Sequence, residues 1–195
     1  MLKVVFFLSL LAILSLVILC APGLFSDRYR FFPPPEPGTW QHKLFWVLFR
    51  SFVIGLILLS YLEFDSMRGK IPLIFGFILL STGIGTACYL SYVTLGKVNS
   101  YGGKGGLRKE GLYLWSRNPV YVATFAGMIG WGIFIGSGYV WVLLIVWSVV
   151  YFIAPFIEER WLAQNYGDAY LEYKSQVPRF IGLSRTVNST YTRNK

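Results

Sequence analysis

The stretch GLYLWSRNPVY at residues 111–121 decides the fold, because it places polar side chains directly before a proline that opens an apolar run. Arg117 and Asn118 precede Pro119, and residues 120–135 are almost entirely apolar. Proline is favoured at the first position of a helix, since its missing N–H would have no partner there and its φ is already helical. The stretch therefore predicts a membrane helix that begins at Pro119, with the polar side chains of Arg117 and Asn118 at the membrane–water interface.

A helical hairpin follows this stretch. Residues 120–135 and 139–156 are two apolar segments, and the link GSG at residues 136–138 is too short for anything but an antiparallel hairpin. The hairpin returns Glu158 and Glu159 to the same depth in the membrane as Arg117. Adjacent residues on a helix point about 100° apart, so we expect one glutamate in a pocket and the other in a supporting contact.

The composition indicates a membrane protein. Of the 195 residues, 55% are hydrophobic and only 14% are charged, and the mean hydropathy is +0.54; soluble domains carry about 25% charged residues. The net charge of +9 does not indicate nucleic-acid binding, because the Lys and Arg residues lie between and after apolar runs. That distribution is typical of cytoplasmic loops beside an anionic leaflet.

Three further apolar runs precede the hairpin, at residues 2–19, 44–62 and 72–95. The first would be about 27 Å long as a helix, close to a bilayer core of about 30 Å; we expect a retained span, with a cleaved signal peptide as the alternative. Glycines in the third favour close helix packing. The sequence thus predicts an all-α polytopic membrane protein with about five transmembrane helices.

We divide the chain into three parts. Residues 1–95 hold the first three spans, and residues 96–183 form a catalytic, cofactor-binding region whose glycine-rich run near residue 104 is a lid or a plain linker. Residues 184–195 have no periodicity and are expected to be disordered. Within the second part, apolar side chains recur at helical spacing and predict one amphipathic cytoplasmic helix through Leu162, Tyr166, Ala169, Tyr170, Tyr173 and Val177.

The distribution of basic residues predicts the orientation. With five spans, fourteen Lys and Arg residues fall on the side of the C-terminus, and three, Lys3, Arg68 and Lys70, fall on the other. The positive-inside rule then puts the C-terminus in the cytoplasm. Arg50 lies within a span, where a charge either snorkels to the interface or faces a pocket.

Nothing in the sequence predicts a metal site. The only histidine, His42, has no neighbouring Cys or carboxylate cluster, and Cys20 and Cys88 belong to apolar runs, where we expect free thiols.

The order of the motifs resembles a known family. The patterns G-x-Y, R-(H/N)-P-x-Y, E-E-x-x-L and Y-G-x-x-Y-x-x-Y are similar to those of the integral-membrane isoprenylcysteine carboxyl methyltransferases and phospholipid methyltransferases. The resemblance covers roughly residues 95–180, and here the motifs read Gly111 with Tyr113, RNPVY at 117–121, EERWL at 158–162 and YGDAYLEY at 166–173.

The resemblance implies S-adenosylmethionine as cofactor and an active site at the cytoplasmic face. Its carboxylate would pair with an arginine, its ammonium or ribose with a glutamate, and its adenine with Tyr113 or Trp115. The residues expected to bind the cofactor are Tyr113, Arg117, Asn118, Tyr121, Glu158 and Glu159. Of these, Arg117, Asn118 and Glu159 are the expected catalytic residues, and Arg50 and Arg179 are candidates for substrate binding.

The acceptor stays open between a lipophilic carboxylate, amine or thiol that enters from the bilayer. Asn118 stands where the family more often has histidine, which excludes proton removal by histidine at that position. Gln176 precedes Val177 and Pro178, where the prenylcysteine enzymes carry a basic residue. The expected partners are therefore a lipophilic or lipidated substrate and membrane lipids, without nucleic acid, and the oligomeric state stays open.

Two other functions remain. One is an NADPH-dependent membrane reductase of the sterol-reductase type, which shares the G-x-Y and R-H-P-x-Y patterns. The acidic pair Glu158 and Glu159 argues against it, because a phosphate-bearing cofactor favours added Arg or Lys. The other is a membrane adaptor without chemistry.

Overall fold

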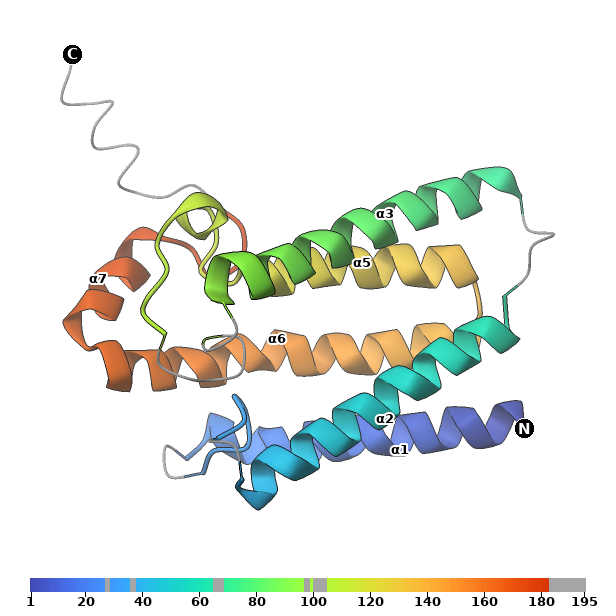
Figure 1. The fold of residues 1–195 in the computed structure, drawn as a ribbon, viewed down its shortest axis with the longest axis horizontal. Helices are drawn as coiled ribbons and strands as arrows, with labels where there is room; N and C mark the ends of the chain where they lie inside the picture. The colour runs from blue at the N-terminus through green and yellow to red at the C-terminus, as the bar shows by residue number, and fades with distance from the viewer. Residues whose placement is uncertain (27–28, 36–37, 65–68, 97–98, 100–104, 183–195) are drawn as a thin grey trace, which may run out of the picture.

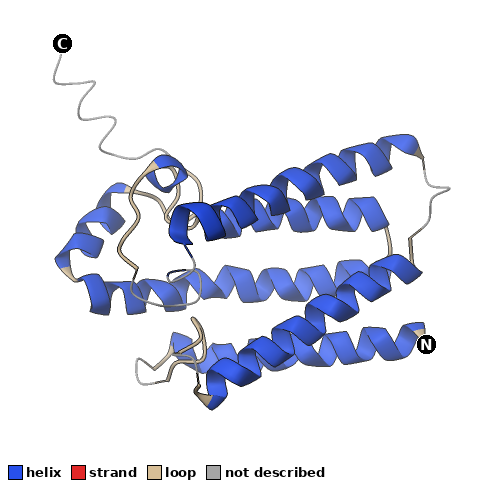
Figure 2. Cartoon of the chain, viewed as in Figure 1, coloured by secondary structure: helices blue, strands red, loops and turns tan. Residues whose placement is uncertain are grey.

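The computed structural model describes residues 1–26, 29–35, 38–64, 69–96, 99 and 105–182, and these residues form helices and loops without a strand (Figure 2). The elements are α1 (Leu2–Cys20), η1 (Ala21–Leu24), α2 (Trp40–Leu62), α3 (Lys70–Tyr89), the π-helical η2 (Leu90–Leu95), the 3₁₀ helix η3 (Gly111–Leu114), α5 (Pro119–Ile135), α6 (Gly138–Tyr166) and α7 (Asp168–Gln176). The predicted all-α class is confirmed. The predicted tail at residues 184–195 and two glycines of the glycine-rich run, Gly102 and Gly103, lie outside the described residues.

Within the residues that the structure describes, four helical segments are long and apolar enough to cross a membrane: residues 2–24, 40–62, 70–95 and 138–166. Helix α5 is also apolar but has 17 residues, or about 26 Å at 1.5 Å per residue. These five segments are the five predicted ones. Large apolar side chains such as Phe7, Ile54, Ile74 and Ile145 are exposed on their outer surfaces, as lipid contact requires.

Helix α6 lies in the middle of the fold, between the pair α1–α2 and the pair α3–α5 (Figure 1). Helices α1 and α2 pack on each other and on α6, whereas α3 packs along α5, which in turn contacts α6. The N-terminus lies at one end of this bundle. Helix α7, η3 and the loop between α1 and α2 lie at the opposite end (Figure 1).

Glycines let α3 and α5 approach backbone to backbone, as the sequence predicted. A Cβ on Gly83 would lie 2.6 Å from the Cα of Gly127, and one on Gly76 would lie 2.8 Å from the Cα of Phe134. Such separations exclude any larger residue. Gly85, in contrast, faces open space, so only part of the glycine content serves packing.

Hydrogen bonds join the helices at the end remote from α7. The Ser137 hydroxyl, in the turn between α5 and α6, donates to Glu63 Oε2 at 2.9 Å, and Trp131 Nε1 donates to the Ser60 hydroxyl at 2.8 Å. Gly136 ends α5 with a φ of +69°, a conformation that glycine adopts without strain. The hairpin turn is thereby held against α2.

The predicted amphipathic helix is not one helix. Helix α6 continues past Phe156 to Tyr166 and so includes Leu162, while α7 begins only at Asp168. Gly167, with a φ of +51°, separates the two. The apolar spacing crosses this break, which explains why periodicity alone predicted a single helix.

Candidate functional site

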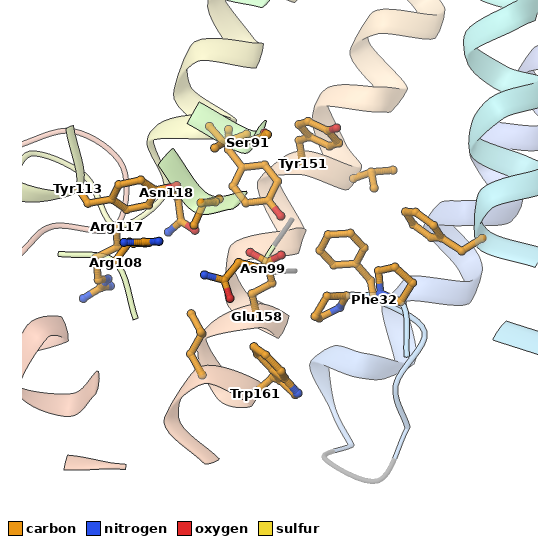
Figure 3. A pocket seen from close by; sticks show the side chains of 18 of the residues that line it. Phe32, Ser91, Asn99, Arg108, Tyr113, Arg117, Asn118, Tyr151, Glu158 and Trp161 are labelled. Atoms are coloured by element: carbon orange, nitrogen blue, oxygen red, sulfur yellow. The ribbon is translucent and has the colours of Figure 1, made fainter. Parts of the chain in front are cut away.

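A cavity of about 250 Å³ lies at the α7 end of the bundle. Its wall is formed by side chains of α1, α2, η2, η3, α5, α6 and α7 and of the loops before α2 and before η3 (Figure 3). The cavity thus lies between the N-terminal helix pair and the predicted hairpin.

One charge cluster joins the predicted motifs beside this cavity. Arg117 Nη2 donates to Glu159 Oε1 at 2.8 Å, and both side chains are buried, with 8% and 4% of their surface exposed. Arg179 donates to both oxygens of the same carboxylate at 2.8 and 3.0 Å, and Lys174 Nζ lies 3.4 Å from Oε2. Three cations therefore surround one carboxylate, and their excess positive charge lies next to the cavity.

The hydrogen bonds with Glu159 raise the pKa of the Arg179 guanidinium above its usual value. Arg117 Nη1 also donates to the Lys174 carbonyl oxygen at 2.6 Å. The cluster accordingly holds α7 and the segment after it against α6.

The segment before α5 is bound to the segment after α7 by backbone and side chain. The Arg117 amide donates to the Pro178 carbonyl at 2.9 Å, and Asn118 Nδ2 donates to the Arg179 carbonyl at 3.0 Å. The Ser116 hydroxyl accepts from the Asn118 amide at 3.0 Å and donates to Arg179 O at 3.3 Å. Asn118 lines the cavity, but its side-chain Nδ2 donates to this junction.

Some buried donors of the cavity wall have no acceptor. The hydroxyls of Tyr113 and Tyr170 and the Nε of Arg117 make no hydrogen bond within the part of the chain that the structure describes. Burial, aided by the charge of Glu158, raises the pKa of the Tyr113 phenol, so it stays a neutral donor. A neighbouring phenol, Tyr173, donates instead to the Tyr113 carbonyl at 2.6 Å. Buried donors without a partner cost about 1–3 kcal/mol each, which a bound ligand with acceptor atoms would recover.

The two glutamates face different surroundings. Glu158 lines the cavity and shares a hydrogen bond with the Tyr121 hydroxyl, whereas Glu159 is enclosed by the three cations. One residue is thus in the pocket and the other in a supporting contact, and the structure assigns the pocket to Glu158. Glu159, predicted to be catalytic, does not line the cavity.

The remaining predicted residues divide between the cavity and its surroundings. Tyr113, Arg117, Asn118 and Tyr121 line it together with Glu158, whereas Trp115 is 58% exposed and does not. The aromatic side chain found beside Glu158 in its place is Trp161, whose ring lies 4.9 Å from the guanidinium carbon of Arg30 (Figure 3).

The two candidates for substrate binding lie outside the cavity wall. Arg179 is bound to Glu159, and its guanidinium lies 4.0 Å from the centre of the Phe156 ring. Arg50 is exposed, with its guanidinium 5.6 Å from the centre of the Trp46 ring. Trp46 itself lines the cavity, so Arg50 covers a cavity-lining side chain from outside.

The first 49 residues also contribute to the cavity wall, which the sequence motifs did not predict. Helix α1, the loop before α2 and the first turns of α2 supply a group of apolar lining residues: Ile13, Leu16, Phe32, Pro33, Pro34, Phe45, Trp46 and Phe49. The apolar runs at residues 2–19 and 44–62 predicted membrane spans and not a cavity wall, although the aromatic and proline content of residues 31–49 was a signal for the other lining residues.

Comparison with known proteins identifies a family. A family model described as phospholipid methyltransferase matches residues 71–169. No curated protein and no solved structure matches the chain. The matched range contains Tyr113, Arg117, Asn118, Tyr121 and Glu158, and it excludes α1 and α2.

Proposed function

The chain belongs to the phospholipid methyltransferase family, and on that premise we propose that it is an S-adenosylmethionine-dependent integral-membrane methyltransferase whose cofactor binds in the cavity beside Arg117 and Glu158. The observation that carries the proposal is that Tyr113, Tyr170 and Arg117 line one cavity together with the carboxylate of Glu158. Each of the three has a buried donor, Oη, Oη and Nε, without a hydrogen bond among the described residues.

These residues fit the polar groups of the cofactor. Arg117 would hold the α-carboxylate, with its Nε as the donor that has no partner among the described residues, and the positive charge in excess around Glu159 would favour that carboxylate. Glu158 is the matching partner for the α-ammonium. The hydroxyls of Tyr113 and Tyr170 would be the donors for ribose or adenine acceptors. The Trp161 ring, which has the Arg30 guanidinium over one face, would stack its other face on the adenine.

The bound cofactor supplies a methyl group on a sulfonium, which a lone pair of the acceptor heteroatom takes over while the bonding electrons leave with the neutral thioether. Such a displacement needs alignment and a dry path more than a strong acid. Two features of the structure support this: aromatic side chains form part of the cavity wall, and the hydrogen bond of Asn118 with the Arg179 carbonyl fixes the polar segment that lines the site.

The proposed acceptor is a lipophilic amine, thiol or carboxylate, and the site is proposed to face the cytoplasm. The apolar side chains around the cavity support a lipophilic acceptor. The amide of Asn118 does not titrate, so an acceptor that loses a proton does not lose it to this residue.

Ligand binding tests the proposal without knowledge of the acceptor. S-Adenosylhomocysteine, the demethylated product, should raise the melting temperature of the purified protein, because a ligand at 100 times its Kd stabilises the folded state by about 2.7 kcal/mol. NADPH at the same concentration serves as the comparison. Stabilisation by NADPH alone, or by neither compound, contradicts the proposal.

A further inference from the structure

The cavity has two sides of different chemistry. Tyr113, Arg117 and Glu158 belong to the range matched by the family model, and they bring the polar atoms. Phe32 and Trp46 precede that range, and they contribute apolar or aromatic surface to the cavity wall. In Figure 3, Phe32 lies on the far side of Glu158 from Tyr113 and Arg117.

We propose that Phe32, Trp46 and Phe49 form the wall that binds the apolar part of the methyl acceptor and determines its permitted width. This inference rests on the proposed methyltransferase function. It assigns the choice of acceptor to the N-terminal segment, while the family-matched segment holds the methyl donor.

The wall is packed too tightly to adapt to differently shaped acceptors. The rings of Phe45 and Phe49 are stacked, with centroids 5.9 Å apart and planes within 8°. The Phe32 ring lies 5.7 Å from that of Phe45, and the Phe49 ring lies 6.0 Å from that of Trp147 on α6. Because each ring supports the next, a wider acceptor has to displace several of them, and close-packed interiors resist such shifts.

The loop that carries Phe32 is itself fixed in place. Arg30 Nε donates to the Pro33 carbonyl at 2.9 Å, and Nδ1 of His42 lies within hydrogen-bond distance, 2.9 Å, of the Pro35 carbonyl. The guanidinium of Arg30 also lies over the Trp161 ring on α6. The loop is therefore bound to both α2 and α6, which restrains the position of Phe32.

The described helices on the two sides of the cavity do not pack closely on each other. Within the described residues, α2 packs on α1 and α6 and has no extensive contact with α3 or η2. Yet α2 lines the cavity on one side, and Ser91 and Leu95 of η2 line it on another. An acceptor that enters laterally between α2 and η2 meets Trp46 and Phe49 before it reaches the polar side.

The width of the acceptor provides the first test. Purified F49A and F32A proteins are compared with the parent for methyl transfer to amines, thiols and carboxylic acids that carry either a straight dodecyl chain or a bulky adamantyl group. The kcat/KM ratio of adamantyl to dodecyl acceptors should rise at least tenfold in each variant. The reason is that even one methylene more or less in a hydrophobic pocket changes the discrimination between two substrates by about 10- to 200-fold. The affinity for S-adenosylhomocysteine should stay within twofold.

The matched control is V47A. Val47 lies between Trp46 and Phe49 on α2, is 60% exposed and does not line the cavity, so its ratio should equal that of the parent. An equal change in V47A, or a loss of S-adenosylhomocysteine affinity in F49A and F32A with an unchanged ratio, overturns the proposal.

Cysteine protection tests the wall independently of turnover. In a C20A/C88A background reconstituted into phosphatidylcholine and phosphatidylglycerol vesicles, inert dodecyl methyl sulfide should slow the reaction of the F49C thiol with N-ethylmaleimide severalfold and leave V47C unaffected. S-Adenosylhomocysteine alone should not protect F49C. Protection of F49C in a protein that does not bind S-adenosylhomocysteine supports the wall and refutes the proposed function. Binding of S-adenosylhomocysteine without protection of F49C refutes the wall alone.

Discussion

Arg117 and Glu159 form a buried ion pair across 42 residues of chain, with Nη2 and Oε1 2.8 Å apart. This pair joins the segment before α5 to the end of the hairpin, and Arg179 and Lys174 add the C-terminal segment to it. The cluster therefore builds the polar side of the cavity, whereas the neighbouring Glu158 faces the cavity itself.

The first prediction concerns this structural role. Glu159→Gln leaves three cations close together without their carboxylate, and removal of one partner from a buried ion pair costs about 3–5 kcal/mol. We expect a lower melting temperature without any ligand, measured by thermal unfolding of the purified protein. Glu172→Gln, at an exposed glutamate of α7, removes the same charge and should leave the melting temperature near that of the parent.

The second prediction separates Glu158 from its neighbour. Glu158→Gln should keep the melting temperature of the unliganded protein and weaken S-adenosylhomocysteine about 10- to 100-fold, because a hydrogen bond to a charged group contributes about 1.5–3 kcal/mol. Isothermal titration in nanodiscs measures the affinity. Unchanged affinity would place the ammonium of the cofactor elsewhere.

The contrast between the two glutamates shows what the sequence could predict. Proline at the start of α5 and the GSG link at residues 136–138 are local signals, and together they predicted that a glutamate would return to Arg117. The angle of about 100° between Glu158 and Glu159 on one helix predicted two different roles. It did not predict which glutamate takes which role, since that depends on how α6 is rotated against α5 and α7.

The contribution of the N-terminal segment could not be predicted in the same way. Phe32 and Trp46 lie more than 60 residues before Arg117, and periodicity describes one helix at a time. It does not specify which helices pack side by side. The break at Gly167 was not predicted because the apolar spacing continues on both sides of it. The helix ends there because Gly167 adopts a positive φ, which the apolar pattern does not record.

The third prediction compares two glycines of α3. Gly83→Ala would force a methyl group against the Gly127 backbone and should destabilise the protein by about 1–3 kcal/mol. Gly85→Ala, which meets open space, should be neutral or stabilising by up to about 1 kcal/mol through helix propensity. Thermal unfolding of both variants measures the difference; equal effects would show that α3 and α5 do not pack as closely as described.

The fourth prediction concerns alkaline pH. Burial raises the pKa of the Tyr113, Tyr170 and Tyr173 phenols above the usual value of 10.0. Since the folded state holds these protons more tightly than the unfolded state, their contribution to stability is complete below pH 10 and is lost as the pH rises through the raised values. The melting temperature should therefore fall above pH 10, and Tyr113→Phe should reduce the slope of that fall. A parallel curve for Tyr113→Phe would contradict the assignment.

The last prediction is the orientation of the chain in the membrane. Among the described residues, Arg108, Lys109, Arg160, Lys174 and Arg179 belong to the segments at the α7 end, and only Lys3 and Lys70 mark the opposite end. The positive-inside rule then places the α7 end, and with it the cavity, in the cytoplasm. A membrane-impermeant maleimide applied to intact cells should label Gly69→Cys but not Ile181→Cys in a C20A/C88A background. Both positions are exposed, and permeabilised cells provide the control, in which both should react. Labelling of Ile181→Cys in intact cells would reverse the orientation, and the proposed site would then face away from a cytoplasmic cofactor.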